Sequence, residues 1–181
     1  MLTPAQWDVV HEDDWGILED WLADGSLSPE VCRELCFATA RHDAGECLRL
    51  LLRAKVVDLE TRQGALFSAI YRRAFIAMHL LLQSGCDVNY CYRMGTPLHC
   101  ALLLELDYGI HLEDLTRIMT GMMVLRHITQ GIELLLKYNP DPTIVVEGRT
   151  PRELALELRQ FAAADLLAAY EQRYAASGGH P

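Results

Sequence analysis

The chain has 181 residues and a net charge of −9, and its 51% hydrophobic and 23% charged residues are typical of one globular domain. No apolar run approaches the roughly 18 to 20 residues that cross a membrane, and the first residues, MLTPAQWDVVHEDD, lack the basic segment and apolar core of a secretion signal, so we expect a cytoplasmic protein. Residues 1–30 contain eight acidic residues and no Lys or Arg, which argues against direct binding of nucleic acid through its phosphates.

The first predicted segment holds two short helices. Thr3-Pro4 provides a capping residue and a first-turn proline, and ILEDWLADGSL reads as an apolar helix followed by a glycine turn. All three tryptophans of the chain lie in this segment, beside the acidic residues. They either fill the core of a terminal segment or leave one ring exposed among carboxylates, as an anchor for a basic partner. The candidate residues for that anchor are Trp15, Asp13, Asp14 and Asp20.

Further along the chain, two apolar helices are each expected to end in a left-handed turn, one at Gly85 and one at Asn139. Before them, in the second segment, Lys55 replaces the usual turn glycine, and Asp58-Leu59-Glu60 reads as an extended end. Residues 74–84 read as one amphipathic helix, because apolar residues recur there at helical spacing. Gly85 follows in the position that favours a left-handed cap.

The sequence repeats itself. QGALFSA at residues 63–69 aligns with GTPLHCA at 95–101, and GRTPRELALEL at 148–158 repeats the Thr-Pro pair and the later alanine. AMHLLLQSGCDVN at 77–89 aligns with GIELLLKYNPDPT at 131–143. These TPLHxA and LLxxGxDxN patterns resemble the ankyrin repeat family, whose units contain two helices, a turn and an extended finger. The resemblance covers nearly the whole chain, though unevenly.

The resemblance implies an all-α fold. We expect an ankyrin-repeat solenoid of about five helix-turn-helix units with short extended fingers, in which stacked units bury one another's apolar faces. The units would form one domain over residues 1–174, followed by a flexible tail at 175–181. The expected bounds of the units are about 3–27, 28–60, 63–94, 95–147 and 148–174.

The fourth unit is longer than the family pattern. Leu81 and Leu135 occupy matching positions 54 residues apart, and so do Thr96 and Thr150, whereas a normal spacing is about 33 residues. An insertion of roughly 21 residues therefore lies at about 106–129. Its apolar spacing predicts a helix, which is either separate or a backward extension of the second helix of the unit.

Motifs of catalytic chemistry are missing from the sequence. It contains no Gly-rich phosphate loop, no G-x-S-x-G elbow and no H-E-x-x-H, so we expect no enzymatic activity, cofactor or metal. For His99, in the TPLHxA motif, the resemblance implies a structural role that holds neighbouring backbone. His111 and Asp114 form too weak a ligand pair for a metal site. The six cysteines lack zinc-binding spacing and are expected to be buried or half-buried thiols.

The finger at residues 87–94 is the leading candidate for partner binding. Tyr90, Tyr92, Arg93 and Met94 are residue types enriched at interface hot spots, whereas solvent-facing finger tips usually carry small polar residues. The alternative is that these side chains pack against the insertion.

The expected function is therefore recognition of another protein through the concave face and the finger tips. The acidic end suits a basic toxin or effector, which makes an inhibitor or immunity protein one hypothesis. A general scaffold or adaptor and an acidic mimic of nucleic acid remain the alternatives.

Overall fold

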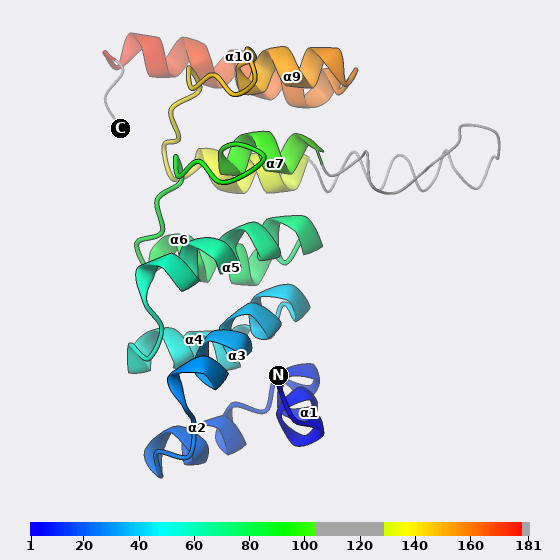
Figure 1. Cartoon of the computed structure of the whole chain (residues 1–181). Helices are drawn as coiled ribbons and strands as arrows, with labels where there is room; N and C mark the ends of the chain where they lie inside the picture. The colour runs from blue at the N-terminus through cyan, green and yellow to red at the C-terminus, as the bar shows by residue number, and fades with distance from the viewer. Residues whose placement is uncertain (104–128, 179–181) are drawn as a thin grey trace, which may run out of the picture. The chain divides into compact units, whose positions relative to one another are not determined.

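The computed structural model describes residues 1–103 and 129–178, and this part of the chain is helical (Figure 1). Within it, extended pairing is limited to two isolated bridges. The chain divides into two compact units, Met1–Asp87 and Val88–Pro181. No helix in the described ranges is long and apolar enough to cross a membrane. The all-α prediction is confirmed at this level.

The N-terminal unit is built from pairs of helices joined by two-residue connections. Helices α1, α3 and α5 pack on one another in chain order, and so do α2, α4 and α6, which produces two layers (Figure 1). The core between the layers includes the fully buried Leu35, Leu51 and Leu66. The helices are α1 Pro4–Glu12, α2 Trp15–Ala23, α3 Pro29–His42, α4 Gly45–Ala54, α5 Leu59–Arg72 and α6 Phe75–Gln83.

Left-handed residues recur in this unit at a constant interval. The first helix of each pair ends at Asp13, Asp43 or Arg73, each with φ between 51° and 57°, and these residues are 30 positions apart. The second helices are followed by Gly25, Lys55 and Gly85, also with positive φ and also 30 positions apart. The expected left-handed turn at Gly85 is confirmed, and Lys55, which replaces the usual glycine, also has a positive φ.

Helix α5 begins earlier than the sequence analysis predicted. Residues 58–60 were expected to be extended, with the next segment starting near residue 63. Instead Asp58 is the N-cap of α5, because its carboxylate accepts a hydrogen bond of 2.7 Å from the Thr61 amide. That bond lowers the pKa of Asp58. By contrast, α6 agrees with the predicted helix at 74–84.

The C-terminal unit contains α7 Pro97–Leu103, a helical stretch at 129–136, α9 Pro151–Glu157 and α10 Phe161–Ala176. Asn139 has a φ of 52°, so the predicted left-handed turn there is confirmed. The predicted insertion at 106–129 lies outside the described residues except for Thr129. Helix α10 continues two residues into the predicted tail, and 179–181 lie outside the description.

Candidate protein-binding site

The first finger, residues 88–95, is a short hairpin fixed at both ends. Buried Val88 anchors its start, and the Tyr92 and Gly95 backbones exchange hydrogen bonds of 3.0 and 2.7 Å. Gly95 has a φ of 117°, and a Cβ added to it would lie 2.8 Å from the His99 Cβ. Only glycine allows both this backbone conformation and this approach to α7. The hairpin is therefore held against its own helix.

The side chains of this finger are presented to solvent. Tyr90, Tyr92 and Met94 have exposed fractions of 38%, 41% and 60%, and Arg93 is exposed as well. The Arg93 guanidinium carbon lies 5.5 Å from the centre of the Tyr92 ring, which is within the range of a cation–π interaction. The structure thus brings together the four predicted finger residues as one exposed group on a braced hairpin.

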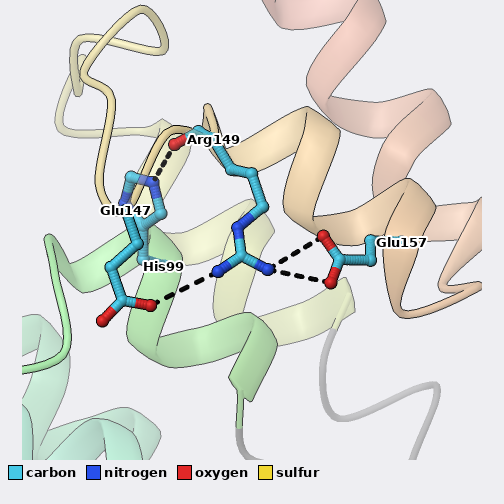
Figure 2. A network of polar contacts seen from close by, with 4 residues as sticks. All are labelled: His99, Glu147, Arg149 and Glu157. Carbon is cyan, nitrogen blue, oxygen red and sulfur yellow. Dashed lines mark hydrogen bonds and ion pairs between the residues drawn. The ribbon is translucent and has the colours of Figure 1, made fainter.

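The second finger, residues 141–149, has the same hairpin but a different surface. Val146 and Arg149 form the matching backbone bridge. Figure 2 shows the Arg149 guanidinium between two carboxylates, with one nitrogen 2.8 Å from both oxygens of Glu157 and another 3.3 Å from Glu147. The arginine of this finger is thus paired within the unit, in contrast to Arg93, which makes no ion pair among the described residues.

The His99 side chain connects α7 to the backbone of the second finger, as Figure 2 shows. Its Nε2 lies 3.2 Å from the Arg149 carbonyl oxygen, and its Nδ1 lies 2.8 Å from the Thr96 hydroxyl. A carbonyl can only accept, so Nε2 carries the proton and Nδ1 accepts from Thr96. The ring is 1% exposed, and burial lowers its pKa, which keeps it neutral. The expected structural role of His99 is confirmed.

A side-chain amide also links the two fingers. The Asn89 side-chain oxygen accepts a 2.7 Å hydrogen bond from the Asp141 amide. The Asp141 carboxylate in turn accepts from the amide and hydroxyl of Thr143, at 2.8 and 2.7 Å. These bonds fix the base of the second finger relative to the first.

Two of the four predicted residues at the acidic end are helix caps. The Asp13 carboxylate accepts from the amides of Glu46 and Cys47 at 3.0 and 2.8 Å, at the start of α4. Asp14 is the N-cap of α2 and accepts from the Ile17 amide at 3.3 Å. Both carboxylates therefore satisfy backbone donors of this chain.

The same device recurs one helix pair later. The Asp43 carboxylate accepts a 2.8 Å hydrogen bond from the Ala77 amide at the start of α6. Neither α4 nor α6 has a side-chain cap of its own, because their N-cap residues are Ala44 and Ala74. The sequence analysis missed this pairing. The signal in the sequence was an aspartate directly after one helix, together with an alanine at the N-cap position of a helix in the next pair.

Trp15 and Asp20 remain as the exposed part of the acidic end. Trp15 is 51% exposed at the first position of α2, Ile17 nearby is 43% exposed, and Asp20 is exposed on the same helix. Trp7 and Trp21 are only partly exposed. One tryptophan ring is therefore exposed on the helix that also carries the exposed Asp20.

The burial of the cysteines agrees with the prediction, with one exception. Cys32, Cys36, Cys47 and Cys86 are buried and Cys100 is half-buried, whereas Cys91 is exposed on the first finger. Burial raises the pKa of Cys47 to about 12. No group of three or more potential metal ligands occurs in residues 1–103 and 129–178. The weighed pair His111 and Asp114 lies outside those ranges.

Comparison with known proteins assigns the chain to no family, since neither a family model nor a curated protein matches it.

Proposed function

We propose that the chain is a non-enzymatic protein-binding module of the ankyrin-repeat type, and that the first finger is its principal contact with a partner. The observation that carries this proposal is the exposed group of Tyr90, Tyr92, Arg93 and Met94 on a hairpin braced by hydrogen bonds. Large aromatic rings and an arginine that are already ordered lose little conformational entropy on binding.

Two features support the repeat architecture. The left-handed residues of the N-terminal unit recur every 30 positions, and the two hairpins of the C-terminal unit, Tyr92–Gly95 and Val146–Arg149, match at an offset of 54 positions. The offset of 54 is the one that the sequence shows between Thr96 and Thr150. Repeated pairs of helices that shield one another's apolar faces leave a row of fingers available for binding.

Purification of the tagged chain from its native cells tests the finger. If a partner is recovered in stoichiometric amount, the amount recovered should fall by about tenfold when Tyr92→Ala and Arg93→Ala are combined. The reason is that hot-spot residues each contribute more than about 1 kcal/mol to binding. The matched control is Val145→Ala on the second finger, where Val145 is 58% exposed. Equal recovery with both variants, or no stoichiometric partner at all, would contradict the proposal.

The acidic end favours a second, more specific role, that of an inhibitor or immunity protein for a basic toxin or effector. Exposed Trp15 and Asp20 offer a ring and a carboxylate on α2, within a segment that contains no Lys or Arg. Complementary charge would speed association with a basic partner. An acidic partner in the purification would remove this hypothesis. Several substoichiometric partners would indicate a scaffold, and competition with DNA would indicate a nucleic-acid mimic.

A further inference from the structure

A row of basic side chains lies where the first helices of the N-terminal unit end. His11 is in the last turn of α1, Arg41 and His42 end α3, and Arg72 ends α5. Each lies one or two positions before the left-handed residue that ends its helix. Since α1, α3 and α5 pack in chain order, these equivalent positions lie next to one another. We call these four residues the basic ridge, and all four are exposed.

Direct contacts show that the ridge is continuous from α1 to α3. The rings of His11 and His42 meet edge to face with centroids 4.7 Å apart. Trp7 touches both rings, stacking on His11 at 5.5 Å and meeting His42 at 5.6 Å. An indole therefore lies beside two imidazole rings.

The arginines extend the ridge on to α5. Arg41 precedes His42 at the end of α3, and Arg72 ends α5, which packs on α3. Burial and, to a smaller degree, the charges of His11, Arg72 and Arg41 lower the pKa of His42. His42 thus contacts Trp7 and His11 from α1, with Arg41 beside it in the chain and Arg72 at the equivalent end of α5.

Arg41 and Arg72 of the ridge take part in no ion pair within the described ranges. Asp13 and Asp43, which follow α1 and α3, already accept backbone hydrogen bonds from α4 and α6. Other arginines of the described residues do form ion pairs, among them Arg33, Arg49, Arg149 and Arg152.

Helix dipoles account for only part of this arrangement. A cation at each helix C-terminus is favourable, but the dipole does not explain two imidazoles in contact or an indole packed against both. On a chain with a net charge of −9, Arg41, Arg72 and two imidazole rings around an indole form a local group of basic side chains, with exposed Asp8 and Glu12 nearby on α1. Such a group complements an anionic ligand that also has apolar parts.

We propose that the basic ridge is a docking site for an acidic segment of a partner protein, whose carboxylates would pair with Arg41 and Arg72 while its carbon chain packs on Trp7. Nucleic acid is the less suitable occupant, because its phosphates are part of the backbone and cannot turn away from the exposed Asp8 and Glu12 on α1, whereas the side chains of glutamates can. The site is separate from the first finger and would be a second contact.

Titration of the full chain with a fluorescent hexaglutamate peptide tests the ridge. We expect saturable binding that a hexaglutamine peptide does not reproduce, and affinity higher at about pH 6 than at about pH 8, because carboxylates attract the protonated form of His42. Arg72→Gln should weaken binding by about two- to fivefold, as expected for an exposed ion pair. Arg53→Gln is the matched control, since Arg53 is an exposed arginine in the last turn of α4, and it should leave binding unchanged.

A second variant tests the proposal by a different measurement, the pH dependence of binding. His42→Gln should flatten the pH dependence of binding while circular dichroism shows an unchanged fold. Equal weakening by Arg53→Gln and Arg72→Gln would overturn the proposal, and so would equal binding of hexaglutamine or of a single-stranded DNA oligomer. Because the probe is a defined peptide and the finger is intact in every variant, these outcomes do not depend on the function proposed for the finger.

Discussion

The two compact units fasten their successive helix pairs in different ways. In the N-terminal unit, the aspartate that ends the first helix of one pair, Asp13 or Asp43, caps the second helix of the next pair. In the C-terminal unit, neutral side chains make the connection, through His99 to the Arg149 carbonyl, Gln160 to the Leu102 carbonyl and Tyr170 to the Pro140 carbonyl.

This difference shows that one architectural task can be met by charged or by neutral groups. The change occurs where Arg73 takes the third aspartate position, because a guanidinium has only donors and cannot cap a helix N-terminus. The boundary between the compact units follows soon after, between Asp87 and Val88. Each type of fastening can be removed separately, which makes the comparison testable.

The largest effect is expected for the neutral fastening. His99→Ala should lower the free energy of unfolding by about 2 to 4 kcal/mol, because it leaves a cavity and removes two buried hydrogen bonds. Hydrogen exchange should show the greatest loss of protection in α7 and α9. An equal loss of protection in α3 and α5 would mean that the His99 hydrogen bonds do not stabilise the C-terminal unit in particular.

A smaller effect is expected for the charged fastening. Asp13→Ala should cost about 1 to 2 kcal/mol in chemical denaturation, since it removes a helix cap and puts alanine in a left-handed conformation. Asp13→Asn should recover much of this loss, because asparagine keeps one acceptor and tolerates that conformation. Asp20→Ala, an exposed aspartate on α2, should change stability by less than about 0.5 kcal/mol. A loss at Asp20 equal to that at Asp13 would refute the capping role.

Acid should distinguish the two units through His99. Its folded pKa lies below the ordinary value of 6.5, so the unfolded chain binds the proton more readily. The contribution of neutral His99 is therefore complete above 6.5 and declines as the pH falls below that value toward the folded pKa. When the unfolding of the His99→Gln variant is monitored by hydrogen exchange in α7, its stability should not show this decline as the pH falls. If the variant keeps the full decline, another group is responsible.

The smallest effect concerns the left-handed turns. Lys55→Gly should raise stability by about 0.5 to 1 kcal/mol, because glycine adopts this conformation without steric cost. Asn139→Gly should give a smaller gain, since asparagine already tolerates it. Thermal melting of both variants tests the order. A gain at Asn139 larger than that at Lys55 would show that the surroundings of each turn outweigh the backbone preference.

The sequence predicted the local signals better than the long-range ones. Thr-Pro pairs identified the starts of α1, α7 and α9, and Gly85 and Asn139 were correctly expected to be left-handed. These features depend on neighbouring residues. Asp58 was missed as a helix cap because the same residue also suits an extended end. The bond from Asp13 to Cys47 spans 34 positions, so it could be found only by matching Asp13 with the uncapped helix start at Ala44 in the next pair.

The candidate site was predicted in part for the same reason. The residue types of the first finger indicated binding, and their exposure agrees with that interpretation. The roles of Asp13 and Asp14 could not be read from composition, because an acidic residue in a cluster and an acidic residue at a cap look alike in sequence. Only the positions of the backbone amides distinguish them.

The constant interval between Asp13 and Asp43 has a consequence for how such a chain changes in length. A duplicated or deleted block of 30 residues that begins and ends at these positions would restore every cap, because each aspartate would again face a helix start 33 or 34 positions further on. Genetic events of that size would therefore be tolerated in this stretch, while shorter ones would break the register. Arg73 marks the end of the stretch in which whole 30-residue blocks can be added or removed.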